Sequence, residues 1–140
     1  MTSQDHFDLK VSLKRKEHSK DINGSDKIFM LVGETLFYTE RFWGFKSEKR
    51  KVQTKSLKLS DKDRTTIFSF ISENQLNIDY KEIIKIDKNY LRNHFTYIVE
   101  LNTREGLTIY QIQSNDRDSK NKSWIKAKKL FKFLRDLSRD

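Results

Sequence analysis

Residues 95–112 read FTYIVELNTREGLTIYQI, and this stretch carries the clearest structural signal in the chain. Apolar and polar side chains alternate on either side of a short polar turn at 103–106, which contains Gly106. A period of two is typical of a half-buried β-strand, and a turn of this length joins antiparallel neighbours. The stretch therefore predicts a β-hairpin whose first strand turns the following side chains to one face: Phe95, Tyr97, Val99 and Leu101.

The same period governs the N-terminal part of the chain. Residues 6–14 alternate, with Phe7, Leu9, Val11 and Leu13 on one side. Ranges 27–32, 35–43 and 49–58 are rich in aromatic and β-branched residues or alternate in the same way, which favours three further strands. The Asn-Gly pair within 21–25 predicts a turn before the second strand, because both residues tolerate a positive φ.

Two segments change to the helical period. Ser60 is a candidate N-cap, with Asp63 three residues later, for a helix over 61–75. A second helix is predicted from Ser123, as its cap, to about residue 138. Between the helices, 77–91 fits a strand better than a helix, and 114–122 is a polar loop.

This order predicts a single α+β domain over residues 1–140. We expect an antiparallel sheet of about five to seven strands, with one internal helix and one C-terminal helix packed on it. The layout resembles small α+β proteins in which one hairpin leads into a capped helix and a second into a terminal helix. The resemblance, which implies an order of elements and no activity, is carried by Leu57, Leu59, Ser60, Ile67, Ile71, Leu76 and the 95–112 hairpin.

Positive charge is concentrated in two segments of this chain, whose net charge is +9. Residues 41–58 hold seven bases and one acid, a net +6, and residues 120–135 hold seven bases and no acid, a net +7. All other residues together are mildly acidic. Clustered charge of one sign attracts phosphates or acidic protein surfaces, whereas a scattered excess only aids solubility. Whether the two segments form one patch depends on the fold.

Catalytic and metal-binding motifs are scarce. The chain has no cysteine, and its three histidines are scattered without ligand spacing, so we expect no metal and no cofactor. A metal-dependent nuclease that uses Asp79, Glu82 and Lys85 is a distant alternative, because carboxylates and a lysine suit phosphodiester cleavage. The protein is therefore expected to be a binding protein and no enzyme.

The expected interaction surface combines the tip of a hairpin with the basic side of the terminal helix. Aromatic residues interleaved with cations can anchor a protein interface or stack on bases. The candidate partner-binding residues are Trp43, Phe45, Lys46, Lys49, Arg50, Lys51, Lys126, Lys129, Lys132 and Phe133.

Three functions remain open at this point. The leading hypothesis is an inhibitor-like protein, similar in type to immunity or anti-CRISPR proteins, that docks on an acidic protein or nucleoprotein complex. The alternative is direct RNA or DNA binding through the same surface, and the nuclease comes third. No membrane partner is expected, because no stretch is apolar enough to span a bilayer, and a cytoplasmic location is the default.

Overall fold

A computed structural model of the chain describes residues 7–18, 22–44, 52–84 and 94–139. It contains a mostly antiparallel sheet of seven strands and two helices, one internal and one C-terminal, which confirms the α+β prediction. Along the chain the elements are β1 (Asp8–His18), β2 (Ile22–Val32), β3 (Thr35–Gly44), β4 (Val52–Lys58), α1 (Asp61–Glu73), β5 (Tyr80–Ile83), β6 (His94–Thr103), β7 (Gly106–Ser114) and α2 (Lys122–Leu137).

The strands lie in the order β4-β3-β2-β1-β6-β7-β5. The hairpin predicted from 95–112 is present as β6 and β7, with Val99 opposite Tyr110 and Thr103 opposite Gly106 at the turn. Gly106 has a φ of +126°, a conformation that side chains with a Cβ rarely adopt, so the glycine sets the turn. β1 joins this hairpin to the β2–β3–β4 meander, and β5 pairs with β7 in parallel.

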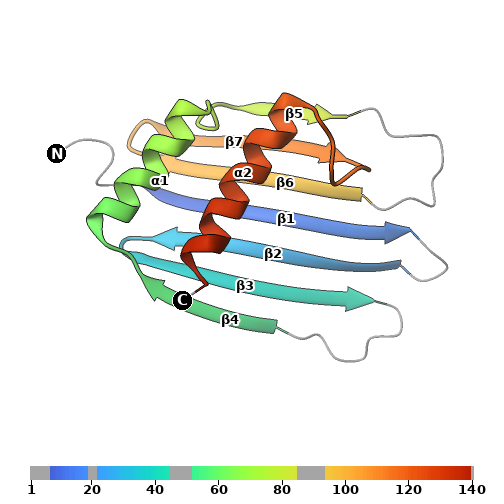
Figure 1. Cartoon of the computed structure of the whole chain (residues 1–140), viewed down its shortest axis with the longest axis horizontal. Helices are drawn as coiled ribbons and strands as arrows, with labels where there is room; N and C mark the ends of the chain where they lie inside the picture. The colour runs from blue at the N-terminus through green and yellow to red at the C-terminus, as the bar shows by residue number, and fades with distance from the viewer. Residues whose placement is uncertain (1–6, 19–21, 45–51, 85–93, 140) are drawn as a thin grey trace.

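Both helices lie side by side over one face of the sheet (Figure 1). The face that they cover receives the alternating apolar residues of every long strand, and the core forms there. Aromatic side chains join the layers, because the Phe131 ring of α2 lies 5.1 Å from that of Phe29 on β2 and 5.7 Å from that of Tyr97 on β6. Trp124 and Ile71 anchor α2 and α1 by complete burial. In the part of the chain that the structure describes, the opposite face of the sheet carries no helix.

The first helix begins as the sequence predicts, whereas the second has a different cap. The backbone N–H of Asp63 donates to Ser60 Oγ at 3.1 Å. At α2 the cap is Asn121, whose Oδ1 accepts from the N–H groups of Ser123 (2.9 Å) and Trp124 (3.3 Å). The predicted Ser123 cap is therefore wrong. The helix starts one residue before Ser123, whose hydroxyl donates instead to the hydroxyl of Tyr80.

Two further expectations differ from the structure. The turn expected at Asn23-Gly24 belongs to β2, because Gly24 lies between two strands and pairs with Lys16 on one side and Trp43 on the other. Pairing on both edges outweighs the turn preference of the dipeptide, since each new ladder satisfies backbone groups. Within 77–91 the described strand is limited to Tyr80–Ile83, and 85–91 lies outside the described residues.

Candidate binding surface

The fold places Lys55 of the first basic segment beside the end of the helix that carries the second. Lys55, on β4, belongs to the first segment, and its Nζ donates to the backbone carbonyl of Ser138 at 3.0 Å. Ser138 caps the C-terminal end of α2, the helix that carries the second segment. The last carbonyls of a helix lack intrahelical donors and carry partial negative charge, so a lysine is well suited to this position.

A groove lies at this junction, on the helix-covered side of the sheet. Its volume is about 570 Å³, within the usual size range of ligand sites. Strands β2, β3 and β4 supply Phe29, Tyr38, Thr54 and Lys55, and the end of α2 supplies Arg135, Ser138 and Arg139. Three cationic side chains, Lys55, Arg135 and Arg139, therefore surround an aromatic floor.

The floor of the groove is formed by two packed aromatic rings, those of Phe29 and Tyr38. The ring centroids of Phe29 and Tyr38 are 4.7 Å apart, and the Tyr38 hydroxyl donates to Glu40 at 3.3 Å. Burial, aided by the Glu40 carboxylate and opposed by Arg135, raises the pKa of Tyr38 to about 12. Tyr38 is therefore a hydrogen-bond donor and never an anion in neutral solution, and Glu40 is the acid closest to its hydroxyl.

A row of basic side chains continues from the groove along one side of α2. Lys128 and Lys132 precede Arg135 by seven and three residues, so the three side chains share one side of the helix. Lys128 is already engaged, since its Nζ donates to the Arg117 carbonyl at 3.2 Å and lies 3.3 Å from Asp118 Oδ1. Lys132 is exposed and continues the charge from the groove toward solvent.

The residues predicted from the sequence are placed unevenly. Lys129 and Lys132 are exposed on α2, as expected of binding residues, and Lys126 is half-buried. Phe133, predicted as an apolar anchor for a partner, stacks on Phe70 of α1 with ring centroids 5.7 Å apart and planes 3° from parallel. This contact joins the two helices and engages one face of the Phe133 ring.

The hairpin-tip half of the prediction lies mostly outside the described residues. The backbone of Trp43 pairs with Gly24 in the β2–β3 ladder. The remaining candidates fall in 45–51, which the structure does not describe: Phe45, Lys46, Lys49, Arg50 and Lys51.

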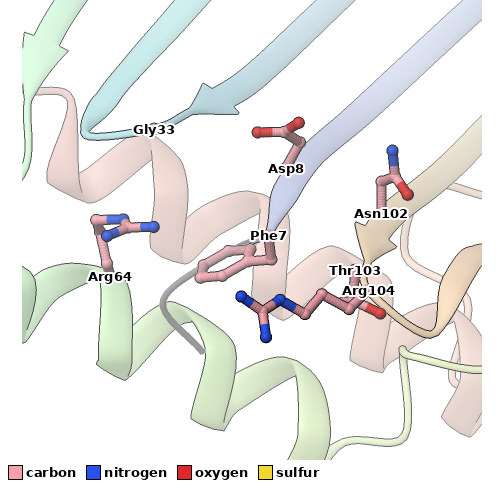
Figure 2. Close-up of a pocket in the computed structure, with 7 residues that line it drawn as sticks. All are labelled: Phe7, Asp8, Gly33, Arg64, Asn102, Thr103 and Arg104. Atoms are coloured by element: carbon pink, nitrogen blue, oxygen red, sulfur yellow. The ribbon is translucent and has the colours of Figure 1, made fainter. Parts of the chain in front are cut away.

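A second hollow, of about 350 Å³, opens at the other end of the strands. Figure 2 shows Phe7 at its centre, with Arg64 of α1 and Arg104 of the β6–β7 turn on either side of the ring. The guanidinium of Arg64 lies 5.5 Å from the centroid of the Phe7 ring, which is a cation–π contact at the edge of the core. Asp8 also lines this hollow and moderates its positive charge, so the groove beside α2 is the more basic of the two.

The carboxylates of the nuclease alternative have structural partners. Asp79 Oδ1 accepts the backbone N–H of Ile109 at 2.8 Å, and Glu82 accepts the hydroxyl of Tyr80. Lys85 lies outside the described residues. Among the residues that are described, no group of three or more histidine, cysteine or acidic side chains is arranged to hold a metal ion. Their helices also include none with the length and apolar character to cross a membrane.

Sequence reasoning did not single out Tyr38, Arg135 and Arg139 as site residues, and Lys55 was counted only as part of a charged segment. Two signals point to them in retrospect. Lys55 precedes Leu57 by two residues on β4, so both side chains lie on the helix-covered side, and Lys55 pairs with Tyr38. Arg135 follows Lys128 and Lys132 at helical spacing. No local pattern in the sequence predicts that the end of α2 reaches β4.

No family model matches the chain, and no curated protein sequence matches it significantly. The interpretation of the surface therefore depends on its own chemistry.

Proposed function

We propose that this protein is a non-enzymatic, inhibitor-like binding protein that docks on an acidic protein or on the acidic protein surface of a nucleoprotein complex. The observation that carries the proposal is the hydrogen bond from Lys55 to the end of α2, beside a groove that is also lined by Arg135 and Arg139. Arginine forks bind carboxylates in bidentate geometry, which gives such a groove directional preference as well as charge. A cytoplasmic location accords with this function and belongs to the same proposal.

The predicted residues extend this surface in the proposal. Lys129 and Lys132 continue the basic side of α2, and the hairpin tip adds Trp43, Phe45, Lys46, Lys49, Arg50 and Lys51. Lys126 and Phe133 take part from the side of α2 that faces α1. Together they would enclose an acidic segment, with the groove receiving one or two carboxylate side chains.

An acidic polypeptide fits the groove better than a nucleic acid does. Proteins that bind single strands stack bases on exposed aromatic rings. In the groove Phe29 is 1% exposed and Tyr38 packs against it, so the aromatic floor offers little flat surface for a base. Carboxylates need only the cations and the hydroxyl donors at the rim. Direct RNA or DNA binding is therefore the second outcome that the test must separate.

The test compares two polyanions of equal charge by fluorescence anisotropy: a labelled polyglutamate peptide and a labelled single-stranded oligonucleotide. The double variant Arg135→Glu/Arg139→Glu removes the groove cations. Each charge-assisted hydrogen bond is worth about 1.5–3 kcal/mol, so this variant should weaken peptide binding by at least about tenfold. The matched control Lys62→Glu/Arg104→Glu makes the same charge change at two exposed positions away from the groove and should change the affinity by less than about twofold.

Other outcomes decide against the proposal. Equal weakening in the groove variant and its control would mean that net charge alone attracts the peptide. Tighter binding of the oligonucleotide than of the peptide, with an affinity that falls steeply with salt, would favour direct nucleic-acid binding. Trp43→Ala/Lys49→Glu tests the hairpin tip separately, and full binding by this variant would remove the tip from the site.

A further inference from the structure

The uncovered face of the sheet is unusually apolar for a surface in contact with water. Of the eight large apolar side chains exposed in the described part of the chain, six lie on this face: Met30, Val32, Phe37, Ile83, Leu107 and Ile109. Their strand neighbours Leu31, Leu36 and Tyr110 are buried on the covered face, so the alternation of each strand turns these six away from the helices. An apolar patch on an open sheet commonly marks an interface.

Two ion pairs neutralise part of the charge of this face. Lys10 on β1 lies 3.9 Å from Glu100 on β6, and Arg41 on β3 lies 3.6 Å from Asp26 on β2. The excess positive charge of the groove lies on the other side of the sheet. A partner with a neutral and partly apolar surface therefore fits this face better than a strongly charged partner does.

Strand register makes two rows of this face complementary to themselves. One row across the sheet runs Met30, Lys10, Glu100, Ile109, that is, apolar, basic, acidic, apolar. A two-fold axis parallel to the strands, between β1 and β6, places β1 over β6 of a second copy and β2 over its β7. Lys10 then faces Glu100 of the second copy, and Met30 faces its Ile109.

The neighbouring row also places two polar residues between two apolar ones. Asp8 pairs with Asn102, and Asn102 pairs with Leu107. Val32 follows Leu31, the partner of Leu9, and so lies beside Asp8. Under the same axis Val32 faces Leu107 of the second copy, and Asp8 faces its Asn102. The exposed fractions of the four apolar residues in the two rows, 40% for Met30, 38% for Ile109, 48% for Val32 and 54% for Leu107, leave surface on each to bury.

The size of the face fits a stable dimer. Seven strands spaced by about 4.8 Å, most of them about ten residues long at about 3.3 Å per residue, span about 1,000 Å². A standard interface buries about 800 Å² on each partner. Two sheets also pack well face to face when their strands are nearly aligned, as this axis makes them.

We infer that the protein forms a symmetric dimer in which two copies of the uncovered sheet face pack on each other, with Lys10 of each opposite Glu100 of the other. The helices and both basic grooves remain on the outside. Each dimer then presents two grooves, one on each outer face. The inference does not depend on the proposed function, because no groove residue takes part in the interface.

Sedimentation equilibrium of the full chain tests the dimer up to about 100 µM, since interfaces of this size reach micromolar affinity or better. The expected species has twice the chain mass of 16.9 kDa. In the variant Lys10→Glu, the new glutamate of each copy faces Glu100 of the other, which gives two repulsive pairs across the axis. This variant should weaken the dimer at least tenfold. The charge swap Lys10→Glu/Glu100→Lys restores an opposite pair and should recover it. Lys62→Glu on α1 is the matched control and should leave the dimer unchanged.

A crosslinking experiment fixes the register. The chain has no cysteine, so Val32→Cys/Leu107→Cys places the only two thiols where the axis brings them together between copies. Within one chain they stand on β2 and β7, three strand spacings or about 14 Å apart. A short bis-maleimide should link two chains of this variant and fail to link Val32→Cys alone. A monomer at every concentration, a dimer that Lys10→Glu leaves intact, or a charge swap that does not recover would each overturn the inference.

Discussion

The two faces of the sheet are built from alternate residues of the same strands, yet they are organised by different rules. On the covered face β1, β2, β6 and β7 contribute side chains that α1 and α2 bury in a continuous apolar core. On the uncovered face apolar side chains lie among ion pairs and remain partly exposed. The first face is complete in a single copy. The second has the composition that the proposed dimer interface requires.

The contrast also separates the two proposed functions in space. The basic groove lies on the side of the helices, where the end of α2 meets β4. The apolar face lies behind it. A protein arranged in this way can associate with itself through one side and meet an acidic partner through the other, and a dimer would hold two grooves for a repeated ligand.

Identical truncations on the two faces should have the most unequal effects. Leu101 on β6 is 2% exposed on the covered face, and Leu107 on β7 is 54% exposed on the other. Leu101→Ala should lower the free energy of unfolding by about 2–5 kcal/mol, because a cavity remains in the core. Leu107→Ala should change it by no more than about 0.5 kcal/mol.

Urea denaturation at protein concentrations low enough to keep the chain monomeric measures this pair of variants. Equal losses would mean that the uncovered face is as well packed as the core. The same Leu107→Ala variant should weaken self-association at high concentration, which Leu101→Ala should do only through its lower stability.

Alkaline pH should act on the covered face, because all four described tyrosines, Tyr38, Tyr80, Tyr97 and Tyr110, point to it. Burial, opposed by Arg135 and Arg117, raises the pKa of Tyr97 to about 12. An unfolded tyrosine ionises near pH 10, so the unfolded state loses its proton first. Stability is therefore unaffected below about pH 10 and falls as the pH rises to 12, by at most about 2–3 kcal/mol for this residue.

Urea denaturation at pH 9 and pH 11 checks the sign. The wild-type protein should lose stability between the two, and Tyr97→Phe should lose less, with Tyr38 accounting for part of the remaining slope because its pKa is also raised to about 12. A wild-type protein that becomes more stable over this interval, or a Tyr97→Phe variant with an unchanged slope, would contradict the assignment.

Periodicity predicted the covered face because burial against two helices demands strict alternation. The hairpin at 95–112, the strand predicted over 6–14 and the Ser60 cap depend on neighbours in sequence, and all are present, the strand as β1 (Asp8–His18). Predictions that depend on distant pairing were less accurate. Gly24 lies within a strand because its backbone pairs with both β1 and β3. At α2 the cap is Asn121, and the hydroxyl of Ser123 donates to the hydroxyl of Tyr80.

The binding surface was predictable only in part, for the same physical reason. The two basic segments can be counted from the sequence, but 80 residues separate Lys55 from Arg135, and only the packed position of α2 joins them. Phe133 has a contact that its neighbours in sequence do not indicate. It stands among lysines in the sequence and was predicted as an anchor for a partner, yet Phe70 stacks on one face of its ring.

The smallest effect is expected for the central ion pair of the uncovered face. Lys10 and Glu100 are 3.9 Å apart, and their side chains are 44% and 32% exposed. An exposed pair of this kind contributes about 0.2–1 kcal/mol, so a double-mutant cycle with Lys10→Met and Glu100→Gln should give a coupling energy near the lower limit in the monomer.

The same cycle run at a concentration that favours the dimer should give a larger coupling. Each lysine then meets a second glutamate across the axis, and loss of water from the interface strengthens both contacts. High salt should reduce the monomer value more than the dimer value, because screening acts mainly on exposed charges. A coupling energy that is the same at both concentrations would leave the ion pair as a surface feature of one sheet and remove it from the proposed interface.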